Sequence, residues 1–189
     1  MLCGFMISRL YRRYFFRTEG ATAVEFALVA VPFTFLLMGI IEVSLFFAAS
    51  AVIQGATTDA ARLIKTGQIQ NSQNTDPQQL FEDRLCDAAS VFANCERLQY
   101  EVAQLNNYSD YSSYPPSYDD DGNLESSGFT TGGSNDIVMV RVVYRYKLMI
   151  PMIAQIFQDS GRSDGTRLIM ATVIFQTEPY DLDQAAEGA

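Results

Sequence analysis

Apolar residues change their spacing along the chain, and each spacing predicts a different kind of element. Residues 21–53 are almost entirely apolar, and Glu25 and Glu42 are the only charges among them. At a rise of about 1.5 Å per residue, this run is longer than the ~20 residues that cross a bilayer as a helix. Apolar residues then recur at spacings of three and four as far as Ile64. We therefore predict one long helix over residues 21–66, transmembrane in its first part and amphipathic in its second.

Alternating apolar and polar residues predict strands in the second half of the chain. Every second residue from Val138 to Leu148 is apolar, while Arg141, Arg145 and Lys147 lie on the opposite face. A period of two sustained this far is typical of an antiparallel strand with one face in water. Two further strands are predicted at residues 97–103, which alternate, and at residues 168–176, which are too apolar for one face to be fully exposed.

The remaining segments predict short helices and connections around a small antiparallel sheet, so the expected fold class is α+β. Short helices are expected over residues 77–92 and 149–157. The predicted divisions are a basic cytoplasmic leader (1–20), a transmembrane and extended helix (21–66), a linker and short helix (67–96), a periplasmic sheet domain (97–180) with a long loop (106–136), and an acidic tail (181–189).

The long loop leaves two questions open. Its acidic run, Ser117 to Gly122, is similar to part of a calcium-binding loop, but Gly128 stands where the bidentate glutamate belongs. A solvated acidic turn is the other interpretation. The loop tyrosines either form a contact surface for another molecule or pack the loop onto its own domain. They are Tyr108, Tyr111, Tyr114 and Tyr118.

Charge around the apolar run predicts the orientation of the chain in a membrane. Basic residues of the leader stay on the cytoplasmic side, so the N-terminus is expected inside and everything after the helix outside. These basic residues are Arg9, Arg12, Arg13 and Arg17. A secretory signal peptide is the alternative, but its apolar region would be only about 7–15 residues long.

Composition narrows the classes of function. The formal net charge is −9 with the basic leader included, and nucleic-acid binding needs a basic surface, so no nucleic-acid partner is expected. The chain has no histidine, which removes the usual nucleophile pairs and zinc sites. No glycine-rich phosphate loop follows a predicted strand. We therefore expect neither enzymatic activity nor a cofactor or metal.

Two of the three cysteines, Cys86 and Cys95, fall in the part predicted to lie outside the membrane. On one unbroken helix their Cα atoms would be about 13.5 Å apart, whereas a disulfide needs roughly 4.4–6.8 Å. A bond between them therefore requires a helix break before Cys95. The alternative is a pair of metal ligands, but the external part offers no histidine and no further cysteine. A disulfide is the favoured interpretation.

Glu25 lies at the start of the apolar run and needs an explanation, because an unpaired carboxylate near hydrocarbon is unfavourable in free energy. A basic leader, Gly20, four residues, and then Glu25 and Phe26 at the start of a long apolar helix resemble the signature of type IV prepilins. That resemblance implies cleavage between Gly20 and Ala21 by a membrane peptidase. The new α-amino group could then pair with Glu25 of a neighbouring subunit and set the register between them. A glutamate that reaches toward the lipid head groups is the other interpretation.

The string RTEGATAVEFALVAVPFTFLLMGIIEVSLFF (residues 17–47) resembles the TadE-like family, minor pseudopilins of the tight-adherence (Tad) system that builds Flp pili in bacteria. Glu42 and the closing Thr177-Glu178-Pro179 are similar to that family as well. The resemblance implies a structural component of pilus assembly in the bacterial inner membrane, incorporated into a pilus or placed at its base. Its implied partners are a prepilin peptidase, other pilin or pseudopilin subunits and the Tad assembly machinery. The competing hypothesis is an uncleaved, single-pass periplasmic binding or scaffold protein.

Overall fold

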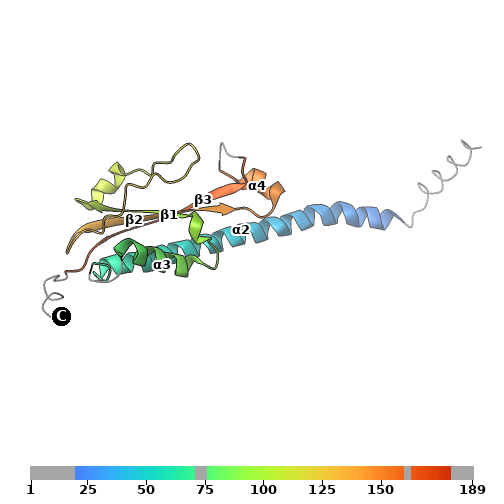
Figure 1. Cartoon of the computed structure of the whole chain (residues 1–189). Helices are drawn as coiled ribbons and strands as arrows, with labels where there is room; N and C mark the ends of the chain where they lie inside the picture. Colours follow the sequence, from blue (N-terminus) through green and yellow to red (C-terminus); the bar gives the residue numbers. More distant parts are fainter. Residues whose placement is uncertain (1–19, 71–75, 160–162, 180–189) are drawn as a thin grey trace, which may run out of the picture. The chain divides into compact units, whose positions relative to one another are not determined.

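The computed structural model describes residues 20–70, 76–159 and 163–179. The chain divides into two compact units, one up to Val43 and one from Ser44 onward, which we call the helical unit and the sheet unit. One helix, α2 (Ala21–Lys65), contributes its first part to the helical unit and its second part to the sheet unit. The sheet unit adds three strands and short helices (Figure 1). The predicted α+β class is confirmed.

The helix α2 ends where the sequence places the signals for an end. Arg62 and Lys65 lie in its last turn, where cations interact favourably with the helix dipole. Gly67 follows with φ 71°, a left-handed conformation that glycine adopts without a side-chain penalty. The backbone N–H groups of Gly67 and Gln68 donate to carbonyls of the last turn, at 3.1 and 3.0 Å. The helix therefore ends one residue before the predicted position.

The sheet is antiparallel, in the order β1-β2-β3. The strands are β1 (Leu98–Leu105), β2 (Ile137–Lys147) and β3 (Thr166–Gln176). Strand β2 is central and pairs along its full length with β3, with Ile137 opposite Gln176 and Lys147 opposite Thr166. The register to β1 places Glu101 opposite Arg141. A helix, α4 (Pro151–Phe157), connects β2 to β3.

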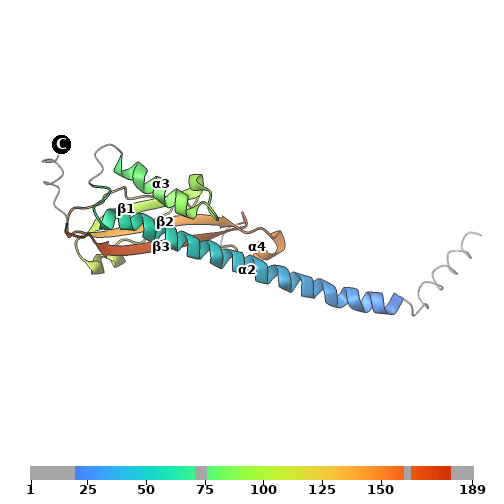
Figure 2. The ribbon, with the colours of Figure 1, turned by 90° about the horizontal axis from the view of Figure 1, so that it is seen from below.

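One face of the sheet is covered by helices. The second part of α2 lies along this face beside α3 (Pro77–Ala89), as Figures 1 and 2 show. The buried positions of this second part of α2 are mostly small, which lets the helix approach the sheet closely. They are Ala49, Ile53, Ala56, Thr57, Ala60, Ala61 and Ile64. The apolar ones among them pack in one core with Val138, Val140 and Val142 of the central strand.

Helix α3 begins and ends for local reasons. The Asp76 side chain accepts a hydrogen bond from the backbone N–H of Gln78 at 3.1 Å, and proline occupies the first helical position. The helix ends at Ala89, three residues before the predicted Phe92. Both Phe92 and Ala93 donate their backbone N–H to the Ala89 carbonyl, so the chain turns away from the helix there.

The other face of the sheet is covered by the long loop. We predicted that this face of β2 lies in water, and that prediction is wrong for its centre. Arg141 is 1% exposed, and Met139 and Val143 are buried. Figure 1 shows the yellow-green segment between β1 and β2 lying over this face. The loop also covers the outer edge of β1, because the backbone N–H and carbonyl of Val102 bond to Gly128 and Thr130 at 3.0 and 2.8 Å.

The chain returns to the end of α2 after the last strand. The backbone N–H of Glu178 donates to the Lys65 carbonyl at 2.8 Å. Thr177 is buried, and its hydroxyl donates to the Gly133 carbonyl at 2.6 Å. These bonds fasten the segment after β3 both to the helix and to the end of the long loop.

Candidate assembly helix

The predicted processing point lies at the start of α2. Gly20 directly precedes the first helical residue, Ala21. Glu25 and Phe26 follow in the second turn, and both are exposed, with Phe26 at 74%. Ala21 and Glu25 are four positions apart, so they lie on the same side of the helix. The carboxylate is therefore accessible near the N-terminal end of α2. The leader arginines (Arg9, Arg12, Arg13 and Arg17) lie outside the described residues.

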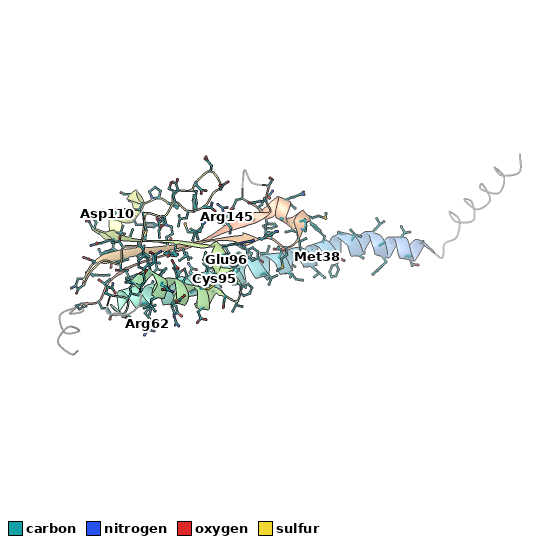
Figure 3. All side chains as sticks on the ribbon, viewed as in Figure 1. Met38, Arg62, Cys95, Glu96, Asp110 and Arg145 are labelled. Atoms are coloured by element: carbon teal, nitrogen blue, oxygen red, sulfur yellow. A yellow bond between two sulfur atoms is a disulfide. The ribbon has the colours of Figure 1, made fainter. Side chains whose placement is uncertain are left out.

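The helical unit presents apolar side chains on all sides. Those between Val24 and Ile41 are mostly exposed, including Leu28 at 70% and Val31 at 71%. Met38, labelled in Figure 3, is 45% exposed. Among the described residues, α2 is the one helix that is long and apolar enough to cross a membrane. A surface that is hydrophobic all round is stable only in lipid or against other helices.

The two acids of the apolar run lie in different environments. Glu25 is exposed, whereas Glu42 is 1% exposed. A buried carboxylate needs hydrogen-bond or charge partners, so Glu42 belongs to the internal structure of the chain. Of these two acids, Glu25 is the one that is accessible to another molecule. The sequence alone did not separate these roles.

Cys86 and Cys95 form the disulfide that the sequence favours, with Cα atoms 5.3 Å apart. Cys86 lies in α3, and Cys95 begins a 3₁₀ turn, η2 (Cys95–Arg97), that leads into β1. Asn94 caps this turn by accepting from the backbone N–H of Glu96 at 3.0 Å. The helix break that the bond requires is therefore present, and the bond fastens α3 to the first strand.

A buried ion pair joins the sheet to the loop, and sequence reasoning missed it. Arg141 of β2 donates through Nη1 to Glu101 of β1, and through Nη2 to the Tyr114 carbonyl of the loop at 2.7 Å. Its guanidinium lies 5.9 Å from the centre of the Tyr111 ring. Ser127, also in the loop, donates to Glu101 through its hydroxyl at 3.0 Å. The pair therefore holds two separate parts of the loop on the sheet.

The loop tyrosines remain partly accessible even though the loop is packed. Tyr108, Tyr111 and Tyr114 are 55%, 39% and 41% exposed. Tyr118 is half-buried, and this burial raises the pKa of its phenol. The loop therefore packs onto its own domain, and three of its tyrosines still present surface.

The acidic run of the loop forms a turn closed by its own groups. Asp119 accepts hydrogen bonds from the backbone N–H of Asn123 at 2.6 Å and from its side-chain amide at 3.0 Å. These bonds hold the pKa of the Asp119 carboxyl below its ordinary value. Among the described residues, no three His, Cys, Asp or Glu side chains are grouped so that they could hold a metal ion.

A comparison with protein-family models matches residues 20–62 to the family described as TadE-like protein. Over this segment, the N-terminal helix of the chain is similar to that family. The match begins at Gly20, includes Glu25, Phe26 and Glu42, and ends inside α2. The similarity therefore covers the helix and does not extend to the sheet. Comparisons with curated proteins and with solved structures find no match to this chain.

Proposed function

We propose that this protein is a minor pseudopilin-like structural component of Tad/Flp type IV pilus assembly. The observation that carries the proposal is the coincidence of three features in α2. The TadE-like match begins at Gly20, the helix begins at the next residue, and an accessible Glu25 follows within an exposed apolar surface. These features concern helix assembly rather than catalysis, so the role that we propose is structural.

The proposed mechanism starts with cleavage after Gly20 by a prepilin peptidase. Cleavage would remove the basic leader and create an α-amino group at Ala21. Glu25 of one subunit would then pair with the amine of a neighbour, because an opposite charge at close range makes a carboxylate tolerable in an apolar setting. The exposed apolar side chains of α2 would pack against helices of other pilin or pseudopilin subunits of the Tad machinery.

The proposed location is the bacterial inner membrane, with the leader in the cytoplasm and the sheet unit in the periplasm. The length and apolar surface of α2 support a single membrane pass. The orientation follows from the basic leader. The disulfide of the sheet unit is compatible with an oxidising compartment.

Gly20→Ala tests processing. A methyl group at this position would meet nothing within 4 Å, so the variant leaves the fold intact. For the parent chain, intact mass and N-terminal sequencing of membrane-extracted protein are expected to give a mature chain that starts at Ala21. The variant should retain its leader, because the peptidase has lost its recognition glycine.

A parent chain that still starts at Met1 would overturn the proposed processing. The free amine at Ala21 would then not exist, and the pairing role of Glu25 would be lost with it. That outcome would favour the uncleaved, membrane-anchored binding or scaffold protein.

A further inference from the structure

Helix α4 and the residue that precedes it by two positions carry apolar side chains that the fold does not use. Ile153 and Ala154 are buried against the core, at 2% and 5% exposed. The opposite side of the same short helix is also apolar but faces outward. Its members are Met149 (72% exposed), Met152 (66%), Ile156 (70%) and Phe157 (39%), which we call the α4 patch.

The α4 patch lies at the end of the sheet unit where α2 enters. Phe46, in the first turn of α2 within this unit, packs edge-on against Tyr146 with ring centres 5.8 Å apart. The Arg167 guanidinium lies 5.3 Å from the centre of the same Phe46 ring. Arg167 also donates to the Phe157 carbonyl at 3.0 Å. Side-chain contacts therefore connect the last residue of α4 to the beginning of α2 in the sheet unit.

The exposed apolar surface of α2 continues along the helix as far as its first turn in the sheet unit. Phe47 is 66% exposed, beside a Phe46 ring that the sheet unit holds. The residues that precede it in α2 are the apolar ones of the candidate membrane span. The α4 patch therefore lies beside the turn of α2 at which the span reaches the folded unit.

The α4 patch itself is uncharged, and a cation precedes it, which suits a lipid surface. Residues 148–158 contain no charged side chain, although the whole chain is acidic. Lys147 precedes the patch and is exposed. The nearest acids bond to the backbone of β3: Asp159 accepts from Leu168 at 2.8 Å, and Asp164 accepts from Thr166 at 3.1 Å. An apolar surface with flanking cations is typical of segments that lie in the head-group region.

We propose that the α4 patch inserts into the head-group region of the bilayer that α2 crosses, and so docks the sheet unit on the membrane. This inference rests on the membrane anchoring in the proposed function. A lipid surface is the occupant that the position favours, because α2 brings the bilayer to this end of the unit. Lys147 would contact lipid phosphates, while Met152 and Ile156 would contact the upper acyl chains.

The test places an environment-sensitive dye on single cysteines in the full chain. Cys3→Ser removes the free thiol, and Met152→Cys gives the label site in the α4 patch. The protein is reconstituted at one chain per nanodisc of phosphatidylethanolamine and phosphatidylglycerol. We expect a blue-shifted emission, and we expect lipids brominated near the head group to quench most of the intensity.

Two control positions separate this inference from the anchoring on which it rests. Ser113→Cys is exposed and follows β1, whose last residue pairs with Ile137 at the far end of β2 from α4. Its dye should show no lipid quenching. Position 36 lies within the span, so a dye on Leu36→Cys should be strongly quenched by lipids brominated deep in the acyl chain. Quenching at 36 but not at 152 overturns the α4 inference alone, whereas no quenching at 36 overturns the membrane anchoring itself.

A second variant tests whether the apolar surface itself is responsible. Ile156→Glu adds a charge to an exposed side chain, so the fold should persist while the dye at position 152 loses most of its lipid quenching. Unchanged quenching would contradict insertion by the patch. A blue shift that appears only when several chains share a nanodisc, without lipid quenching, would assign the patch to a second copy and overturn the proposal.

Discussion

Arg141 is a charged residue at a position that the sequence pattern predicts to be exposed to solvent. Its guanidinium is buried, pairs with Glu101, and holds the loop through the Tyr114 carbonyl. Removing one member of a buried pair leaves the other charge without compensation, which typically costs about 3–5 kcal/mol. This one interaction therefore joins three separate segments of the sheet unit, namely β1, β2 and the loop.

We expect Arg141→Met to destabilise the folded chain by about 3–5 kcal/mol, because it leaves Glu101 buried and unpaired. Denaturant unfolding followed by circular dichroism measures this loss. Chymotrypsin should also cut the loop faster after Tyr111, since Arg141 no longer holds it.

The matched control is Arg141→Met combined with Glu101→Leu, which removes both charges. Much of the lost stability should return, because no buried charge is left without a partner. If the single and the double variant are equally unstable, the cost arises from packing rather than from the unpaired carboxylate.

At the scale of elements, one tyrosine joins α3 to β1 beside the disulfide. The Tyr100 hydroxyl of β1 donates to the Glu82 carboxylate of α3 and accepts from the Gln78 side-chain amide at 2.8 Å. Burial, followed by the hydrogen bond to Glu82, raises the pKa of Tyr100 well above its ordinary value of 10.0. The phenol therefore keeps its proton in the folded chain at a pH where the unfolded chain loses it.

This raised pKa gives a pH dependence of defined sign. The contribution of Tyr100 is fully present below pH 10, its ordinary value, and falls as the pH rises above it, because only the unfolded state then releases the proton. We expect Tyr100→Phe to lose up to about 1 kcal/mol at neutral pH and to show a shallower fall in stability above pH 10. Unfolding midpoints across that range measure both effects.

Tyr108→Phe is the control for the alkaline measurement, because it removes a phenol from an exposed position of the loop. Its stability should follow that of the parent chain at every pH. A Tyr100→Phe variant as steep as the parent would show that other groups cause the alkaline loss.

The elements themselves could largely be predicted from the sequence, but the covering of the sheet could not. The apolar run, the end of α2 near Gly67 and the alternation in β2 are local patterns, and the structure has the elements that they predict. The loop has no period, so nothing in it indicates that it lies on the sheet. The pairing of Glu101 with Arg141 depends on the register between strands that the 31-residue loop separates, and a pattern of apolar residues does not encode that register across such a gap.

The features of the candidate site also separate into those that the sequence predicts and those that it does not. The positions of Gly20, Glu25 and Phe26 relative to the helix start could be predicted, because they are fixed by short-range spacing. The burial of Glu42 and the outward side of α4 could not, since both depend on which side of a helix packs against the rest of the chain. The sequence predicted a short helix over residues 149–157, but it did not indicate that only one side of α4 would be buried.

At the scale of the whole molecule, the proposed assembly depends on an accessible carboxylate near the helix start. We expect Glu25→Gln to be processed like the parent chain but to lose cross-linking to neighbouring subunits in membranes, because an amide cannot attract the α-amino group as a carboxylate does. Cross-linking yield from cells that produce the pilus measures this loss.

Glu96→Gln is the matched control, because it makes the same chemical change on the exposed surface of the sheet unit, where Figure 3 labels the residue. It should cross-link like the parent. Full cross-linking of a processed Glu25→Gln chain would remove the carboxylate from the assembly mechanism.

The hydrogen bond between the Glu178 backbone N–H and the Lys65 carbonyl has a consequence for C-terminal fusions, because it fixes where the chain lies after β3. Strand β3 starts opposite Lys147, close to α4, and its eleven residues carry the chain roughly 33 Å away, at about 3.3 Å per residue. The last described residue, Pro179, therefore follows β3 at the end of the sheet unit opposite the α4 patch. An affinity tag or a fluorescent protein on the C-terminal side is thus attached to the chain at a distance from the α4 patch.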